Sequence, residues 1–568
     1  MKGSDLSANA EAIITAGLKP ELFAGRGVLA NSRALVFAAL VVLVLAGFGF
    51  RVTGLSAEGL SEDELNKLNA LADYRSHGLT GANGEHPMLM KAVQAASIIA
   101  AEKWNAFAPA EQIAPETALR LPNVIAGALT ALLIYLVAAE LFGAEVALIA
   151  AALWAFNPSA IAFARIAKED TFLLFFFLLA NVFWLRGQRV AESTDRNPNK
   201  YYWATAACYG AMIASKYLPQ IFAVSICYYW MFQQLPETRW RLGKIKLLKF
   251  FAIMAVVFLV LSPTVLLPET WRQMGLFAGG QRVSHDSYEF MGQLYPQRLT
   301  DWLHGVPVYF YFVYTAVKLP VLTVIAFVVG LPLLFRRKLG DGRYFILFWL
   351  FLWVVTFSLP GGKFTRYYTT VLPAVLITAA LGIQFAGRWL AQRIASLDFA
   401  AGLRHYVPAC LAVIVIGSSV VNSSQAAPHF RLFTNAFGGG VDRAGYYFPH
   451  DEFYDASMRD VIGEVARRAR SGARVVSESP TLAAYYAQRA GRADLLCISL
   501  SDPDALKQLT AGDFVIIARG RRYFSNDSLI NALQNQSPLL NFNLGPTPSA
   551  KLYQLDQQSL ARLLPNSR

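Results

Sequence analysis

Long apolar runs recur along almost the whole chain, and they constrain its fold more than any other feature. The first run, residues 34–50, reads ALVFAALVVLVLAGFGF and contains no charged residue. A helix of about 20 apolar residues crosses the roughly 30 Å hydrocarbon layer of a bilayer. Runs of about this length predict about eleven crossings, at residues 34–50, 118–141, 144–163, 170–185, 201–216, 218–234, 250–267, 308–335, 343–359, 367–386 and 407–422. We therefore expect a polytopic α-helical membrane protein with its termini on opposite sides.

The composition agrees with this expectation. Of the 568 residues, 55% are hydrophobic and only 16% are charged, which is unlike a soluble multidomain chain. The net charge of +13 does not indicate a nucleic-acid partner, because Lys and Arg lie in short clusters between the apolar runs. The four cysteines form no C-x-x-C pair, so neither a disulfide framework nor a cysteine metal site is indicated.

The basic clusters predict the orientation of the chain. They fall in alternate short loops, within residues 186–196, 239–249, 336–343 and 388–404. Short loops rich in Lys and Arg are retained in the cytoplasm. We therefore expect a cytoplasmic N-terminus. The outer side would then hold the segments 51–117, 163–170, 268–306 and 360–366 and the tail that follows the last crossing.

The tail differs in character from the rest. It has mixed polarity, with strand-like runs at 474–477 and 514–518 and helix-like stretches at 456–470, 481–490 and 503–510. This pattern predicts two domains. Residues 1–424 would form the membrane domain, with large outer loops at 51–117 and 268–306, and residues 425–568 a small α/β domain outside the membrane.

An acidic cluster follows the first crossing. The stretch EGLSEDELNK, residues 58–67, places Glu62, Asp63 and Glu64 within about one turn. Ionisable residues at the membrane boundary indicate a functional site. A structural reading has equal weight, because Ser61 and Glu64 fit the S-x-x-E capping box and acids in a first turn complement the helix dipole.

Cationic residues and one histidine lie on the same expected side. In the tight turn at residues 165–170, two cations lie beside two acids, an arrangement that would suit an anionic lipid head group. Alternatively, Asp170 could simply cap the next helix. Taken singly, a cation at the membrane interface often only snorkels and a lone His is more often structural. A binding site is favoured because all of these residues lie on the same expected side of the membrane. The candidates are His86, Arg165, Lys168, Lys216, Lys363 and Arg366, with Asp170 as the accompanying acid.

Several short motifs occur in a suggestive order along the chain. After the Asp63-Glu64 pair come His86-Pro87, R-L-P-N at 120–123, A-R-x-A-x-x-D-T-F at 164–172, S-K-Y-x-P at 215–219 and K-F-x-R-Y from Lys363. In this order they resemble the membrane glycosyltransferases of family 39, which include protein O-mannosyltransferases and the transferase that adds aminoarabinose to lipid A. The stretches 302–320 and 447–455 look like those of bacterial members.

The resemblance implies a GT-C fold, with an active site in an outer cavity under the first loop and a polyprenyl-phosphate sugar as donor. It maps the acidic pair of the family onto Asp63 and Glu64, and its second acid onto Asp170. The chain departs from the family's H-P-P pattern by having Met88 after His86-Pro87, which leaves the role of His86 open. It also lacks a W-W-D-type signature, which disfavours transfer of a preassembled glycan to Asn.

The resemblance implies a glycosyltransferase, and a single in-line displacement would make it an inverting one. Such an enzyme must deprotonate an acceptor and stabilise the departing phosphate. We expect Asp63 to be the base, Glu64 and Asp170 to position acceptor or sugar, and the cations above to supply the phosphate contacts. No cofactor is certain: a divalent cation, Mg²⁺ or Mn²⁺, could bridge acid and phosphate, but no ligand spacing requires one.

Two other classes remain as alternatives. A transporter or flippase for an anionic lipid-linked sugar would use the same cations without breaking a bond, but transport sites usually lie near the bilayer midplane. A structural membrane scaffold would use the acids only as caps. The sequence names neither the sugar nor the acceptor, which could be a protein, a lipid or a glycan. We expect the protein in a bacterial inner membrane, with the tail periplasmic or extracellular.

The orientation can be tested with a reporter fused after Asn422. Because the Lys and Arg asymmetry holds across successive loops, we expect alkaline phosphatase activity from that fusion and no cytoplasmic fluorescence from the matching fluorescent fusion. Fluorescence without phosphatase activity would contradict the topology and an outward-facing site.

Overall fold

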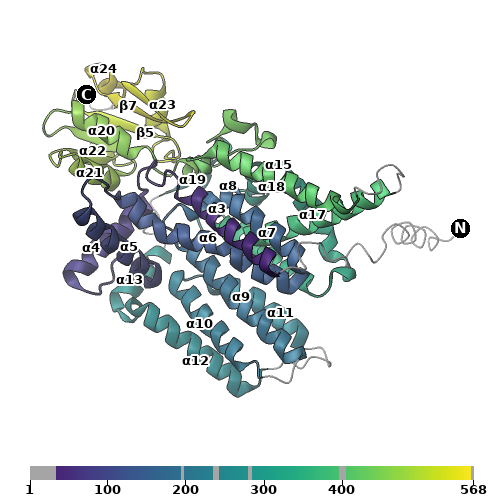
Figure 1. Ribbon diagram of the computed structural model, residues 1–568. Helices are drawn as coiled ribbons and strands as arrows, with labels where there is room; N and C mark the ends of the chain where they lie inside the picture. Colours follow the sequence, from purple (N-terminus) through teal and green to yellow (C-terminus); the bar gives the residue numbers. More distant parts are fainter. Residues whose placement is uncertain (1–32, 194–196, 234–241, 279–284, 396–403, 564–568) are drawn as a thin grey trace.

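The computed structural model describes residues 33–193, 197–233, 242–278, 285–395 and 404–563. The N-terminal segment and the basic residues Arg196, Arg239 and Arg241 lie outside these ranges. The apolar part is a bundle of helices (Figure 1), namely α3 (Arg33–Val52), α6 (Pro115–Phe142), α7 (Ala144–Phe156), α8 (Pro158–Ala164), α9 (Glu169–Ser193), α10 (Asn199–Ser215), α11 (Ala223–Gln233), α12 (Lys244–Leu261), α14 (Phe310–Lys318), α15 (Val321–Gly330), α16 (Gly342–Ser358), α17 (Leu372–Ala395) and α18 (Val407–Ala426).

Each of the predicted apolar runs contains a helix, but the helices differ in length. Within the described ranges, five are long and apolar enough to cross a membrane, α3, α6, α9, α17 and α18, or six if α7 and α8 count as one span bent by 61°. The run 308–335 is divided at Pro320, which has no N–H to continue a helix. The polytopic architecture is therefore confirmed, while the number of about eleven crossings stays a prediction.

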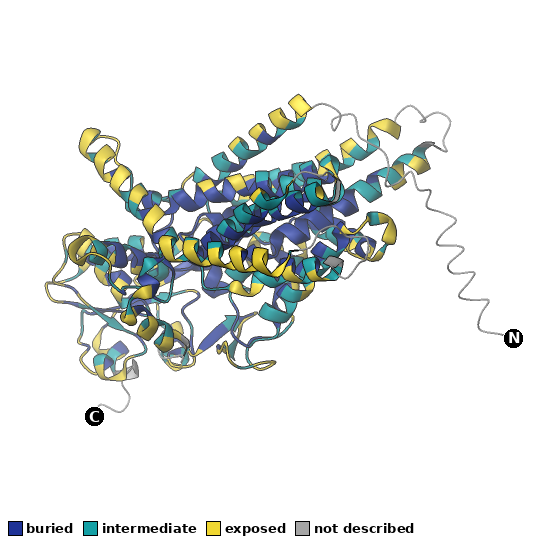
Figure 2. Ribbon diagram, turned by 90° about the horizontal axis from the view of Figure 1, so that it is seen from below, coloured by how far each residue is buried: buried dark blue, intermediate teal, exposed yellow. Residues whose placement is uncertain are grey.

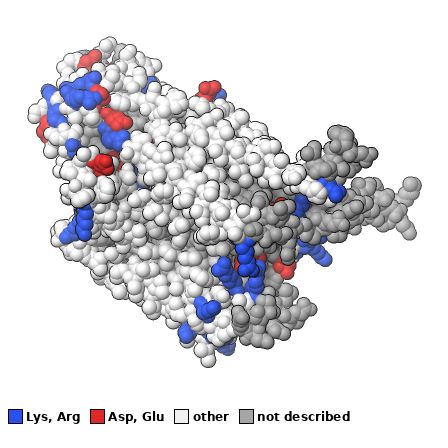
Figure 3. Space-filling model, viewed as in Figure 1, with Lys and Arg blue, Asp and Glu red and all other residues white. Residues whose placement is uncertain are grey.

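The surface of the bundle fits a lipid environment. In the view of Figure 3, charged residues gather toward the ends of the molecule and leave a broad uncharged band between them. Helix α12 buries Phe250 alone among its residues, and its exposed side chains include Ile245, Leu248 and Val260. Buried positions run through the interior of the bundle (Figure 2). Exposing such apolar side chains to water would cost free energy, whereas lipid tails surround them without this cost.

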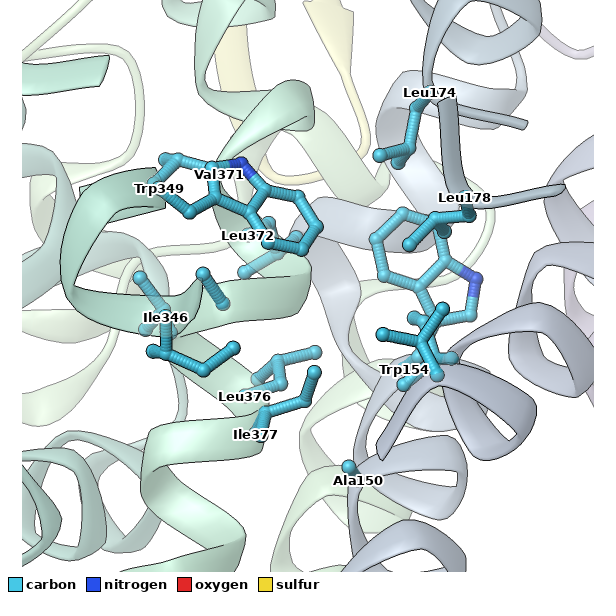
Figure 4. Packing of buried hydrophobic residues seen from close by; sticks show 14 of the residues in the cluster. Ala150, Trp154, Leu174, Leu178, Ile346, Trp349, Val371, Leu372, Leu376 and Ile377 are labelled. Atoms are coloured by element: carbon cyan, nitrogen blue, oxygen red, sulfur yellow. The ribbon is translucent and has the colours of Figure 1, made fainter. Parts of the chain in front are cut away.

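Two tryptophans lie at the centre of the bundle. Trp154 of α7 and Trp349 of α16 pack with aliphatic residues of α9 and α17 such as Leu178 and Leu376 (Figure 4). Each buried indole N–H has a partner, since Trp154 donates to the carbonyl of Gly127 at 2.8 Å and Trp349 to that of Thr370 at 2.9 Å. These bonds remove the cost of burying an unpaired donor.

Further elements cover one end of the bundle. They are α4 (Glu62–His77), α5 (Met88–Phe107), α13 (Pro268–Ala278) and a hairpin of β1 (Ser287–Phe290) and β2 (Gln293–Pro296). The tail lies at the same end (Figure 1). Residues that are distant in the sequence therefore meet there.

The tail forms an α/β unit. Its elements are α19 (Pro449–Phe453), α20 (Met458–Arg468), β3 (Arg474–Ser477), α21 (Pro480–Arg489), β4 (Leu496–Ser499), α22 (Pro503–Leu506), β5 (Phe514–Ala518), α23 (Asp527–Gln534), β6 (Leu540–Leu544), β7 (Thr547–Gln554) and α24 (Gln557–Leu563). The sheet order is β4-β3-β5-β7-β6, with β3 parallel to β4 and β5, and with β7 antiparallel to its neighbours. The strands predicted at 474–477 and 514–518 are confirmed to the residue, whereas β4, β6 and β7 were not predicted.

Helices α15 and α17 approach each other at two glycines. A Cβ atom added at Gly382 would lie 2.0 Å from the carbonyl oxygen of Ala326, and one at Gly330 would lie 1.9 Å from that of Thr378. Backbone atoms cannot move aside as a flexible side chain can. Small residues are thus required where these two helices touch.

We expect Gly382→Ala to destabilise the protein by about 1–3 kcal/mol, because the added methyl group forces the two helices apart. The measurement is the thermal unfolding midpoint in detergent. Gly417→Ala is the matched control, since a Cβ on that α18 glycine meets no atom within 4 Å. Equal midpoints for the two variants would show that the close approach does not limit stability.

Candidate active site

A cavity of about 1400 Å³ lies at the end of the bundle that α4, α13 and the tail cover. Its walls come from three parts of the chain: the first outer loop, the segments around β1, β2 and Phe364–Tyr367, and the tail. Residues that line it include Asp63, Lys67, His86, Arg366, Tyr454 and Arg521. Of the nine predicted site residues, Asp63, His86 and Arg366 are among its lining residues.

The capping box predicted at the start of α4 is present. Ser61 Oγ accepts a hydrogen bond from the Glu64 N–H at 3.3 Å, and the Glu64 carboxylate accepts one from the Ser61 N–H at 2.9 Å. This arrangement fixes the residue at which the helix begins. Glu62 and Asp63 are consequently held in the first turn, where both line the cavity.

Glu64 has a structural role rather than the predicted role in positioning a substrate. Its two carboxylate oxygens each receive a hydrogen bond of 2.8 Å from the Arg120 guanidinium, and Oε1 also accepts the Ala167 N–H at 2.9 Å. The side chain is fully buried and does not line the cavity. It joins α4 to α6 and to the turn before α9, so its acceptors are used within the protein.

Asp63 is held by two side chains. Its Oδ2 lies 2.5 Å from Lys168 Nζ and also accepts a hydrogen bond from the Tyr454 hydroxyl. Burial would raise the pKa of Asp63, but Lys168, Arg366 and Lys67 outweigh it and keep this pKa well below its ordinary value. Asp63 therefore carries a negative charge over the whole physiological range, with Lys168 as its ion-pair partner.

Asp170 and Lys216 form a second ion pair. Lys216 Nζ lies 2.6 Å from Asp170 Oδ1 and 4.8 Å from the centre of the Tyr367 ring. Neither charged residue lines the cavity, whereas Tyr367 does. The pair therefore contacts a residue of the cavity wall without lining the cavity itself, so the predicted role of Asp170 in positioning acceptor or sugar has no support from its placement.

Two of the predicted phosphate-binding cations are engaged with the backbone. Arg165 donates to the carbonyls of Arg51, Thr53 and Gly54 at 2.7–2.8 Å. Lys363 donates to the carbonyl of Val306 at 2.8 Å and to that of Pro360. Neither residue lines the cavity, so both serve to hold loops in place and the prediction of a phosphate contact is not supported for them.

Arg366 differs from these cations. Its guanidinium lies 4.0 Å from the centre of the Phe364 ring and lines the cavity. Within the described ranges it makes no ion pair or hydrogen bond. An Arg side chain is always charged and presents up to five N–H donors, so Arg366 offers the cavity a cation with free donors.

His86 lines the cavity as a neutral ring. Burial, only partly offset by Glu169, lowers the pKa of His86 to about 3. Its Nδ1 lies 3.6 Å from Glu169 Oε1, and the same oxygen lies 3.0 Å from Lys67 Nζ. His86 is therefore a hydrogen-bonding group and not a positive charge for a phosphate.

Sequence reasoning missed the part of the site that the tail supplies. Tyr454 and Asp455 have positive φ angles of 45° and 62°, and this sharp turn directs Tyr454 to Asp63 and Asp455 to Arg521. The stretch 447–455 stood out only as resembling bacterial family members. Glu62 was visible in the acidic cluster but received no role, and nothing in the sequence marked Arg521.

Within the described ranges, no group of three or more His, Cys, Asp or Glu side chains is arranged to hold a metal ion. A requirement for Mg²⁺ or Mn²⁺ thus stays a prediction.

Two solved structures share the overall fold. ArnT from Cupriavidus metallidurans bound to undecaprenyl phosphate is 14% identical, with a TM-score of 0.50 over 92% of this chain and 98% of that one. The apo oligosaccharyltransferase of Archaeoglobus fulgidus is 12% identical, with a TM-score of 0.50 over 86% and 70%. The fold is thus the GT-C fold of membrane glycosyltransferases.

The family model described as dolichyl-phosphate-mannose-protein mannosyltransferase matches residues 112–266, which include the Arg165–Asp170 turn and Lys216. This match confirms the resemblance to family 39 for that part of the chain. None of the curated proteins matches it by sequence.

Proposed function

We propose that this protein transfers a sugar from a polyprenyl-phosphate-linked donor to a protein, lipid or glycan acceptor, with inversion, on the outer face of a bacterial inner membrane. The observation that carries the proposal is Arg366, a cation with free donors in the same cavity as the negatively charged Asp63. ArnT, which shares the fold, was solved with undecaprenyl phosphate bound.

Arg366 suits the phosphate of the donor. The neighbouring cations Lys67, Lys168 and Arg521 are each paired with a carboxylate, namely Glu169, Asp63 and Asp455. Arg366 can therefore bind an anion without breaking an existing ion pair. Charge on the phosphate grows as the bond to the sugar breaks, so the same contact also stabilises the transition state.

Asp63 suits the acceptor. Both of its contacts fall on Oδ2, which leaves Oδ1 without a hydrogen bond in the described part of the chain. This oxygen can accept a hydrogen bond from an acceptor hydroxyl or amine and aim it at the anomeric carbon. One in-line displacement inverts that carbon.

A transporter or flippase explains the cavity less well. The ionisable residues of this cavity lie at helix starts and in loops at one end of the bundle. Transport sites usually lie on interrupted helices near the bilayer midplane. Release of free polyprenyl phosphate from a labelled donor separates the two functions, because only a transferase breaks the bond.

Asp63→Asn should abolish turnover per folded molecule, because the amide removes the negative charge that orients the acceptor. It should also lower the unfolding midpoint, because the buried Lys168 loses its ion-pair partner. Polyprenyl phosphate release and the unfolding midpoint are measured together. Ser61→Ala is the control: about 1 kcal/mol less stable through loss of the cap, but active. Wild-type rates in purified Asp63→Asn would refute the assignment.

Arg366→Ala should weaken binding of undecaprenyl phosphate by on the order of 2 kcal/mol, or about 30-fold in Kd, and slow transfer as well. Arg165→Ala is the matched comparison. Because its guanidinium binds backbone carbonyls, we expect a lower unfolding midpoint with donor affinity per folded molecule unchanged. Donor titration gives the Kd of each variant, and thermal unfolding gives the midpoint. If Arg366→Ala stays within twofold of wild type, the phosphate is held elsewhere.

A further inference from the structure

Glu62, the residue before Asp63, also faces the cavity. Its side chain is 31% exposed, and its closest ionic neighbour is Arg521, whose NH2 group lies 3.5 Å from Glu62 Oε2. That guanidinium is already paired through two hydrogen bonds with Asp455. In the described part of the chain, no N–H or O–H group donates a hydrogen bond to the Glu62 carboxylate. It is therefore open to a ligand.

Glu62 and Asp63 differ in the contacts that stabilise the negative charge of each carboxylate. Asp63 has a lysine and a tyrosine hydroxyl on one oxygen, and a carboxylate stabilised in this way is a weak base. Glu62 accepts no such hydrogen bond in the described part of the chain, and its ionic neighbour Arg521, at 3.5 Å, is shared with Asp455. Both side chains line the same cavity, so one ligand in it can contact both carboxylates.

Negative groups surround Glu62 from several elements. Asp63 belongs to α4, Asp455 to the turn before α20, and Glu478 to the loop after β3, while Arg521 in the loop after β5 opposes them. Burial first, and then Asp455, Asp63 and Glu478, raise the pKa of Glu62 to about 7 in spite of Arg521. A proton acceptor is most effective when its pKa lies near the working pH.

We propose that Glu62, and not Asp63, takes the proton from the acceptor in the transfer reaction. This inference rests on the proposed function. The acceptor O–H or N–H bond breaks and its proton passes to the Glu62 carboxylate, while the acceptor atom bonds to the anomeric carbon. The bond from that carbon to the phosphate oxygen breaks, and its electron pair leaves on the phosphate beside Arg366. Asp63 orients the acceptor, and Glu62 later returns its proton to water.

The first test is the pH dependence of turnover. Glu62 must be unprotonated to accept a proton, so kcat/KM of the wild type should rise as the pH increases through about 7. Glu62→Gln should lose about 10²–10⁴-fold in kcat and lose this rise, with undecaprenyl phosphate affinity unchanged. Turnover is followed as polyprenyl phosphate released from labelled polyprenyl-phosphate mannose or aminoarabinose, with host-cell membranes as the source of acceptor. Glu102→Gln, on the exposed surface of α5, is the control expected to match wild type.

A second measurement needs no substrate. The infrared difference spectrum of purified protein between pH 5 and pH 9 should contain a carboxyl signal that titrates near pH 7 and is absent in Glu62→Gln. If that variant does not fold, Glu62→Asp should retain turnover and a titrating carboxyl group. An unchanged rate and pH profile in Glu62→Gln, or no lost infrared signal, would overturn the role of Glu62. Wild-type protein that binds undecaprenyl phosphate but releases none from either donor would count against the proposed function, while the infrared result would still decide the ionisation of Glu62.

Discussion

The buried ion pair between Glu64 and Arg120 determines the geometry of the site. Two charged groups are costly to bury unless each has several hydrogen-bond partners. Here both do, because Glu64 also accepts hydrogen bonds from backbone N–H groups and Arg120 also donates to carbonyls of the loop before α4. Such a network tolerates little displacement. The first turn of α4 is thereby fixed against α6 and the turn before α9, which brings Asp63 to Lys168.

Charge pairing then defines which residues a ligand can use. Lys67 and Arg521 line the cavity and each has a carboxylate partner, Glu169 and Asp455. Among the lining cations in the described part of the chain, Arg366 and Arg298 have no such partner, and Arg366 lies against an aromatic ring. An anion can therefore bind at these cations without displacing a carboxylate.

The sequence predicted the membrane class, the capping box, two strands and the importance of the Asp63 region, because apolar length and local spacing are encoded over a few residues. Matching to the family-like motifs S-K-Y-x-P and K-F-x-R-Y ranks Lys216 and Arg366 ahead of Arg165 and Lys363, but it does not show what any of these side chains contacts. All four are cations at similar boundaries, and only the fold decides whether backbone carbonyls surround the side chain. The sequence also could not assign Tyr454 or Arg521, since both reach the cavity through contacts that span hundreds of residues.

The turn at Tyr454 and Asp455 makes the candidate site depend on a segment that follows the whole apolar bundle. Asp63 is synthesised early, with the first loop, but the tyrosine that bonds to it follows the last apolar helix by about thirty residues. Chains emerge and fold from the N-terminus. A nascent or truncated polypeptide would therefore hold an unfinished site while it is still being inserted.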